Sequence, residues 1–289
     1  MEYAFIMNPA AGTGFSVTVM EELESVLKQR GIAYRVLKTE YRGHATEIAN
    51  QLSRDPDIIA VVSVGGDGTA SETACGLAGT GKPFGIIPAG TGNDFIKCVH
   101  IPKDPLQALE LILNGSPTET DMGLLNDSMF LNVCGTGFDV TVLDYTESFK
   151  KRFRGLTPYL FGLIKSIFHY KPVHLKVEAD GETTEGDFLV CSIANGQYIG
   201  GGIPICPLAA SDDGLLDLVL IDNIPKRRIP LYLPGLLMGK DLSFKIARHQ
   251  RVRSIKVTGE GMRLNVDGEI FPMDQAEFRI QPAAIMLYR

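Results

Sequence analysis

The chain has 289 residues, of which 45% are hydrophobic and 21% charged, a composition typical of a globular protein with one large or two ordinary domains. Its net charge of −6 argues against duplex nucleic acid as a partner, because phosphate neutralisation requires clustered Lys and Arg. The five scattered cysteines form no CxxC pair and no apolar run reaches the roughly 20 residues that span a bilayer, so we expect a cytoplasmic protein without structural zinc, disulfides or a spanning helix.

The first 115 residues alternate between strand and helix patterns. The predicted elements are a strand at 3–8, a helix at 16–30, strand 33–39, helix 44–53, strand 58–64, helix 70–78, strand 84–88 and helix 105–114. Such alternation is typical of βαβ units and predicts a mostly parallel sheet. The run IIAVVSV at 58–64 is apolar without alternation, as expected for a strand covered on both faces. We therefore predict an α/β domain over residues 1–120.

From about residue 117 the pattern changes to short alternating segments separated by turn residues. This texture predicts an antiparallel, β-rich second domain over residues 121–282, with helical stretches near 155–170 and 226–238. The last strand, at 283–289, either completes this domain or returns to the first. A cleft between two domains is the default place for a ligand.

Three glycine-rich loops follow strands of the first domain: NPAAGTG at 8–14, GGDGT at 65–69 and PAGTGND at 88–94. The carboxyl ends of parallel strands share one edge of the sheet, where helix N-termini offer free N–H groups to anions. Glycines at 65, 66 and 68 would let the backbone approach phosphate oxygens closely. The alternative is that these glycines serve only tight turns.

Familiar nucleotide motifs almost match this chain. GLAGTGKP at 76–83 has the Walker A spacing, but Pro83 stands where a metal-binding Ser or Thr is required. None of the three loops has the third glycine of a dinucleotide-binding fingerprint. A carboxylate such as Asp67 would repel phosphates unless a divalent cation lay between them, so Asp67 indicates Mg²⁺; a turn-stabilising Asp is the alternative.

GGDGT and PAGTGNDF at this spacing resemble the catalytic domain of the diacylglycerol kinase family, in particular its soluble bacterial lipid kinases. The resemblance extends over nearly the full chain. The other matching positions are NPAAG at 8–12, Thr39, GHA at 43–45, Glu72, SDDGLLDL at 211–218 and NVDGE at 265–269.

This resemblance implies an N-terminal α/β domain like those of phosphofructokinases and NAD kinases, a β-sandwich second domain, and ATP with Mg²⁺ as cofactors. It implies that Asp67 is linked to the magnesium of ATP and that Asp94 belongs to the same network. The implied nucleotide-binding residues are Asn8, Pro9, Ala10, Ala11, Gly12, Thr39, Gly65, Gly66, Gly68, Thr69, Glu72, Thr91 and Asp94.

The resemblance also implies two functions in the second domain. Glu269 would be the general base that takes the proton from a lipid hydroxyl. A structural magnesium would be held by Asp213 and the carbonyl oxygens of Ala210 and Leu215. An Asp-Gly turn without an ion is the alternative for that loop, and one carboxylate makes a weak magnesium site.

The best indication of the acceptor is the basic, aromatic stretch at 149–171, which holds six Lys or Arg residues and no acid. Such a segment suits the interface of an anionic membrane, where a peripheral enzyme reaches a lipid hydroxyl. The alternative is a helix packed on the second domain. A second basic region, at 226–256, has nine Lys or Arg against Asp241.

We therefore predict an ATP- and Mg²⁺-dependent lipid kinase that converts diacylglycerol to phosphatidate. Phosphatidylglycerol, a sphingoid base and a polyprenol remain open as acceptors, because each has a hydroxyl on an apolar tail. The first alternative is a NAD kinase, which shares GGDGT and the two-domain plan, and the second is a non-catalytic nucleotide-binding regulator. A homodimer is also compatible with the sequence.

Overall fold

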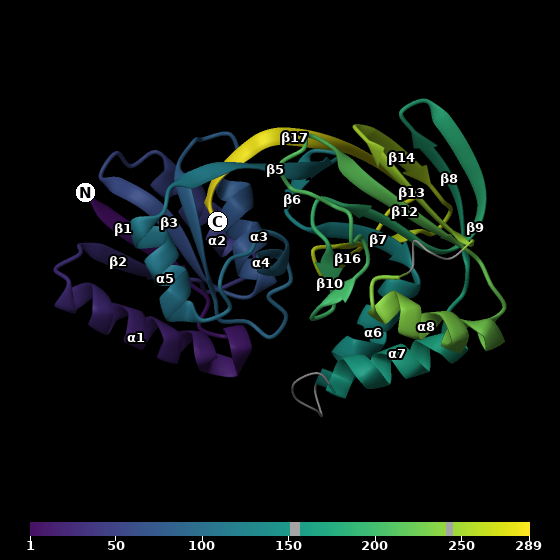
Figure 1. Cartoon of the computed structure of the whole chain (residues 1–289), viewed down its shortest axis with the longest axis horizontal. Coiled ribbons are helices and arrows are strands. Elements are labelled where there is room, and N and C mark those ends of the chain that lie inside the picture. The colour runs from purple at the N-terminus through teal and green to yellow at the C-terminus, as the bar shows by residue number, and fades with distance from the viewer. Residues whose placement is uncertain (151–156, 241–244) are drawn as a thin grey trace. The chain divides into compact units, whose positions relative to one another are not determined.

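The computed structural model describes residues 1–150, 157–240 and 245–289 (Figure 1). Contacts within the chain divide it into two compact units. Unit 1 comprises Met1–Met122 and Pro282–Arg289, and unit 2 comprises Gly123–Gln281. No helix of the described ranges is long and apolar enough to cross a membrane.

Unit 1 alternates strands and helices, as its sequence pattern predicts. Its elements are β1 (Glu2–Met7), η1 (Ala11–Gly14), α1 (Phe15–Gln29), β2 (Tyr34–Lys38), α2 (His44–Ser53), β3 (Ile58–Gly65), α3 (Asp67–Leu77), β4 (Pro83–Pro88), α4 (Phe95–Cys98) and α5 (Pro105–Asn114), followed by β5 (Pro117–Leu125), which runs into unit 2.

The strands of unit 1 are parallel and lie in the order β4-β3-β1-β2. Because the crossovers are right-handed, the chain places α1 on one face and α2 and α3 on the other. The contacts agree, since α1 packs against α5 and α2 against α3. The strand order reverses between β1 and β3, so the loops after these two strands flank the switch point where such sheets bind ligands.

The helices of unit 1 form where the apolar spacing predicts them. In α1 the buried apolar residues Val19, Met20, Leu23 and Leu27 share one face. Helix α5 begins with Pro105 after Asp104, whose carboxylate accepts the Gln107 N–H at 2.9 Å. Helix α3 begins at Asp67, three residues earlier than predicted, so the GGDGT loop is partly the first turn of a helix.

Unit 2 is built mainly of antiparallel strands. Its elements are β6 (Ser128–Phe130), β7 (Val133–Gly137), α6 (Phe138–Lys150), α7 (Thr157–His169), β8 (Val173–Ala179), β9 (Glu182–Ala194), β10 (Tyr198–Ile199), β11 (Ile203–Pro204), β12 (Leu216–Asp222), η2 (Lys226–Arg228), α8 (Ile229–Leu237), β13 (Ala247–Val252), β14 (Ser254–Thr258), β15 (Arg263–Val266), β16 (Glu269–Pro272) and β17 (Gln275–Tyr288), which ends in unit 1.

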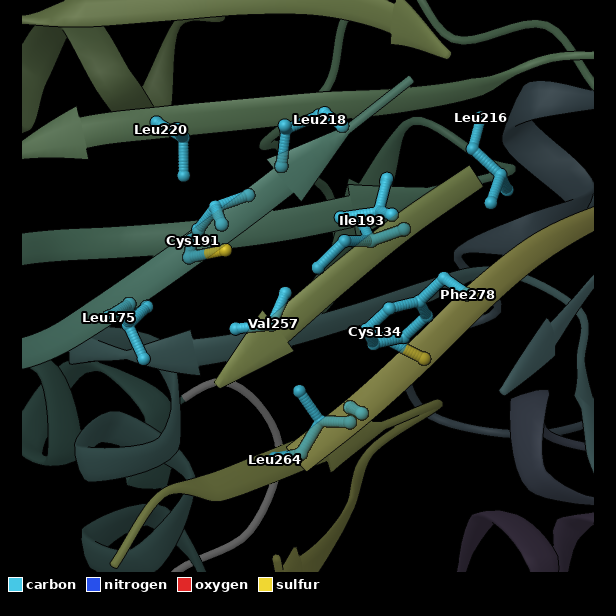
Figure 2. Close-up of a cluster of buried hydrophobic side chains, with 14 of the residues drawn as sticks. Cys134, Leu175, Cys191, Ile193, Leu216, Leu218, Leu220, Val257, Leu264 and Phe278 are labelled. Atoms are coloured by element: carbon cyan, nitrogen blue, oxygen red, sulfur yellow. The ribbon is translucent and has the colours of Figure 1, made fainter. Parts of the chain in front are cut away.

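Central strands of unit 2 are buried on both faces. On β12, Leu218 and Leu220 join an apolar core shared with the other strands, while Val219 and Ile221 point to a second core against the helices. Figure 2 shows the first core, where Cys191 and Ile193 of β9 meet Val257 and Phe278. Successive side chains of these strands therefore point alternately into one apolar core and the other.

The fold class of α/β domain plus antiparallel β domain is confirmed. One feature differs from expectation: helix α6 was not predicted, because Val, Thr and Tyr in FDVTVLDYTESFK favour strands. The last strand returns to unit 1, one of the two predicted alternatives, as the end of a strand that begins in unit 2. In β17, Arg279 pairs with Ser254 of β14 in unit 2, and Met286 pairs with Pro83 in unit 1.

Candidate functional site

The loop after β1 is tied to the loop after β3. The Asn8 side-chain oxygen accepts the Ala10 N–H at 3.0 Å, and the Asn8 amide nitrogen donates to Thr69 Oγ1 at 3.3 Å. Residues 8–14 then turn through the left-handed region at Gly12, Thr13 and Gly14. Asn8 thus connects the two loops that flank the switch point of the sheet.

Most of the loop glycines are required by packing between the loops themselves. A Cβ on Gly90 would lie 2.3 Å from the Gly66 Cα, and one on Gly65 would lie 2.5 Å from Thr69 Oγ1. A Cβ on Gly12 would lie 2.5 Å from the Ala89 carbonyl oxygen. Gly65 therefore has a packing reason to be glycine, whereas a Cβ on Gly66 would lie 3.2 Å from the Gly90 Cα, which is tight without being excluded. The close approach of a ligand to these two glycines stays a prediction.

Gly68 is different. It lies exposed in the first turn of α3 and its φ is not positive. Apart from its chain neighbours and the backbone of its own helix, no atom of the described residues lies within 4 Å of where its Cβ would stand. Glycine in a helix is less favourable than alanine by up to about 1 kcal/mol. The N-cap of α3 is Gly66, which has no side chain to accept the first N–H groups of the helix. The space beside Gly68 is thus open to a ligand at a helix N-terminus.

Asp67 holds the loop after β4. Its Oδ1 accepts the backbone N–H of Asp94 at 2.5 Å and of Phe95 at 3.2 Å. A Cβ on Gly92 would lie 2.9 Å from Asp67 Oδ2, so glycine keeps that side of the carboxylate clear of side chains. Lys97, which we did not single out from the sequence, donates to Asp94 Oδ1 at 2.5 Å and to the Gly92 carbonyl at 3.1 Å. The sequence signal for this ion pair is the spacing of three residues between Asp94 and Lys97, which places both side chains on one helix face.

The remaining predicted nucleotide residues follow the ends of neighbouring strands. Glu72 lies on α3, and its Oε2 accepts the Ala45 N–H at 3.2 Å, so this carboxylate caps α2. Thr39 follows β2 and is half-buried, and its N–H donates a hydrogen bond to the Met7 carbonyl at 2.9 Å. Thr91 is exposed in the loop after β4. The structure thus places the predicted nucleotide-binding residues of unit 1 on four loops and one helix that start from the same sheet edge.

In unit 2 the predicted turn before Glu269 is present. Asp267 and Gly268 both have positive φ, 48° and 96°, as a two-residue type I′ hairpin turn requires. Val266 at the end of β15 pairs with Glu269 at the start of β16. Glu269 is exposed.

Asp267 anchors this turn to a distant segment. Its carboxylate accepts three backbone N–H groups, from Leu131 at 2.8 Å, Asn132 at 2.9 Å and Val133 at 3.1 Å. Charge-assisted bonds of this kind are stronger than those between neutral groups. We did not single out Asp267 beyond its role in the turn, because its partners are more than 130 residues away in sequence.

Asp139, at the first turn of α6, has a buried carboxylate although the residue keeps some exposure. Its Oδ1 has no hydrogen-bond partner in the described part of the chain, and its Oδ2 accepts from Asn265 Nδ2 at 3.3 Å. Desolvation raises the pKa of Asp139 to about 6, and hydrogen bonds from Asn265 and nearby backbone oppose that rise. Perturbed buried carboxylates mark functional sites more often than ordinary ones do.

The loop predicted to hold a structural magnesium carries two carboxylates, those of Asp212 and Asp213, of which Asp213 is the predicted ligand. Its Oδ1 accepts the Leu215 N–H at 3.1 Å, and Arg251 Nη1 lies 3.6 Å from its Oδ2. No group of three or more His, Cys, Asp or Glu residues is placed to hold a metal in the ranges that the structure describes. A magnesium ion here would therefore depend on carbonyl oxygens and water.

Two family models match the chain in succession. The diacylglycerol kinase catalytic domain matches residues 2–125, and the YegS C-terminal NAD kinase beta sandwich-like domain matches residues 132–289. A protein of Pseudomonas putida named "Probable lipid kinase YegS-like" is 35% identical over 79% of this chain and 76% of its own length. The diacylglycerol kinase of Mycobacterium tuberculosis is 28% identical over 98% of this chain and 94% of its own.

The fold is also found in a solved structure. A crystal structure of a diacylglycerol kinase from Bacillus anthracis superposes with a TM-score of 0.73, covers 99% of this chain and 96% of its own, and is 21% identical. At that identity the likeness supports the fold alone.

Proposed function

The chain belongs to the diacylglycerol kinase family of ATP-dependent lipid kinases, and we propose that it transfers the γ-phosphate of ATP to the free hydroxyl of diacylglycerol. The observation that carries the nucleotide site is Gly68, a helical glycine whose Cβ would meet no atom of the described residues beyond its own helix. Relatives named diacylglycerol kinase support the choice of acceptor.

We place the phosphates of ATP at the N-terminus of α3, where the N–H groups beginning at Asp67 face the space beside Gly68. The first turn of α2 is less available, because Glu72 accepts its Ala45 N–H. The proposed contacts to ATP come from Asn8, Pro9, Ala10, Ala11, Gly12, Thr39, Gly65, Gly66, Gly68, Thr69, Glu72, Thr91 and Asp94.

Asp67 fits a magnesium ion bound together with the nucleotide. A carboxylate oxygen is a ligand that Mg²⁺ prefers, and Gly92 keeps side chains away from Oδ2. Since no three-residue metal cluster occurs in the described ranges, phosphate oxygens of ATP would have to complete the ligand set. The bound ion would neutralise charge on the phosphates during transfer.

Glu269 is the proposed general base. Its carboxylate would take the proton of the lipid hydroxyl while the hydroxyl oxygen bonds to the γ-phosphorus and the bond to ADP breaks. Its exposure allows substrate to reach it, and the anchored turn before it limits its movement.

Exposed apolar residues on two helices of unit 2 support docking at a lipid surface. On α7, Phe161, Ile164 and Phe168 are 42%, 46% and 69% exposed and share one face, while Leu163 and Ile167 pack on the core. On α8, Leu231 is 77% exposed. Figure 1 shows α6, α7 and α8 gathered on one side of the strands of unit 2.

Cations lie beside these apolar side chains. Lys226 of η2 donates to the Phe168 carbonyl at 3.1 Å, which joins the end of α7 to the start of α8, and Arg227 and Arg228 are exposed next to it. Neither 157–171 nor 223–240 contains an acidic residue. Residues 151–156 of the basic stretch lie outside the described ranges. We propose that this mixed surface binds anionic membranes.

Gly68→Ala should raise the KM for ATP at least about tenfold, because the new methyl group occupies the space of the phosphates. Its melting temperature should equal or exceed that of the wild type, since alanine suits a helix better. Gly186→Ala is the control, because its Cβ would meet only one atom, at 3.9 Å. A Gly68→Ala enzyme with the wild-type KM would contradict this nucleotide site.

Glu269→Gln should lower kcat on diacylglycerol vesicles at least about 100-fold, because an amide cannot take the proton. ATP binding and melting temperature should be unchanged, as they should be for Glu260→Gln, an exposed Glu in the same unit. Phosphate transfer from labelled ATP is measured with diacylglycerol, phosphatidylglycerol, sphingosine and NAD as acceptors. Transfer to NAD alone would refute the proposed acceptor.

The Ala210–Leu215 loop is proposed as a second magnesium site, with Asp213 and the carbonyl oxygens of Ala210 and Leu215 as protein ligands. We expect Mg²⁺ without nucleotide to raise the melting temperature of the wild type and not that of Asp213→Asn. Equal shifts in both proteins would exclude this loop as the site. The test needs millimolar Mg²⁺, because a single carboxylate binds it weakly.

Phe168→Glu combined with Leu231→Glu should weaken binding to phosphatidylglycerol vesicles at least about tenfold, through lost apolar burial and added negative charge. Activity on a dissolved short-chain diacylglycerol should remain, because the nucleotide loops are untouched. Leu106→Glu, on exposed Leu106 of α5, is the control. Vesicle sedimentation measures binding, and unchanged sedimentation of the double variant would rule out this surface.

A further inference from the structure

A chain of polar contacts runs from α6 to the residue before Glu269. Asp139 Oδ2 accepts from Asn265 Nδ2 at 3.3 Å, and Asn265 Oδ1 accepts the Gly268 N–H at 2.9 Å. Glu269 follows directly. The contacts all lie within unit 2 and connect three elements: α6, β15 and the turn before β16.

The chemistry of the pair fixes which way the Asn265 amide faces. An ionised carboxylate only accepts hydrogen bonds, so it selects the NH₂ group of Asn265. The carbonyl oxygen of the same amide must then face the Gly268 N–H. With the amide reversed, its oxygen would meet the carboxylate and its NH₂ would meet another donor, and both contacts would be lost.

The strand residues around Asp139 leave space for its carboxylate. Asn265 is 7% exposed and pairs with Gly135 of β7 on one side and Ile270 of β16 on the other. A Cβ on Gly135 would lie 2.5 Å from Asp139 Oδ2, so a side chain at that position would force the carboxylate to move.

An ionised Asp139 is unfavourable for folding. Its folded pKa of about 6 exceeds the ordinary Asp value, so the folded state binds the proton more tightly than the unfolded state. Stability therefore falls as the pH rises from about 4 to 6 and stays lower above that range. Nearby, burial raises the pKa values of Cys134 and Cys191, which keeps both thiols neutral, and Asp267 accepts backbone amides.

We propose that Asp139 is a positioning residue for Glu269: its carboxylate orients the Asn265 amide, and that amide holds the turn from which Glu269 projects. This inference rests on the proposed role of Glu269. A residue that served packing alone would be better replaced by neutral asparagine, which avoids the cost of a buried charge.

The test compares two substitutions of Asp139. Asp139→Leu removes the acceptor and should lower kcat at least tenfold while the KM for ATP stays within twofold. Asp139→Asn keeps an acceptor oxygen and should restore kcat to within threefold of the wild type. It should also melt at a higher temperature than the wild type at pH 8, with the difference shrinking toward pH 4.

Asp144→Asn is the matched control, since Asp144 lies on the same helix and its carboxylate pairs with Arg263 at the surface. Its kcat should be that of the wild type. Wild-type kcat in a folded Asp139→Leu enzyme would overturn the proposal. If Asp139→Leu does not fold, Asn265→Ser decides in its place: a kcat at least tenfold lower supports the proposal, and an unchanged kcat overturns it.

Glu269→Gln, measured alongside, separates the two hypotheses. An inactive Glu269→Gln with a fully active Asp139→Leu refutes the positioning role and leaves the general base intact. An active Glu269→Gln refutes the general base itself.

Discussion

The close backbone contact between the loops after β3 and β4 determines what unit 1 can bind. The Ala89 N–H donates to the Gly65 carbonyl at 2.7 Å, and Gly90 approaches Gly66 so closely that a Cβ on Gly90 would lie 2.3 Å from the Gly66 Cα. With these loops joined, Asp67 reaches the backbone of Asp94 and Phe95. The N-terminus of α3 then stands beside the switch point of the sheet, where an anion meets N–H groups and the helix dipole.

Unit 2 depends on a different constraint, the two buried faces of its central strands. Because alternate residues of β9 and β12 face the helices, α6, α7 and α8 each must bury one face against them. That requirement accounts for Leu163 and Ile167 on α7. Phe161 also has a partner within the unit, because its ring centroid lies 5.7 Å from that of Phe149 on α6. The same requirement does not account for exposed Ile164 and Phe168, which are the physical basis for assigning this face to lipid.

Sequence patterns predicted the elements of unit 1 well because β3 and β4 are almost wholly buried and α1, α2 and α5 each have one apolar face. They also identified the three loops, the turn before Glu269 and the family. They missed α6, whose β-branched residues favour a strand in isolation, and they did not reveal that Thr69 lies where a Cβ on Gly65 would stand. They also missed contacts between residues distant in sequence, such as those of Asp267 with the amides of residues 131–133.

An aspartate in each unit holds loops together through hydrogen bonds from backbone N–H groups, whatever part it takes in catalysis. Asp67 accepts amides of Asp94 and Phe95, and Asp267 accepts those of Leu131 to Val133. Removing Asp67 would release the loop after β4 as well as any bound magnesium, so lost activity in such a variant would not separate the two roles. Gly68 is the more informative position, because a methyl group there would meet no atom of the described residues outside its own helix. A methyl group at Gly68 would therefore displace solvent or ligand and leave the described contacts of the loops in place.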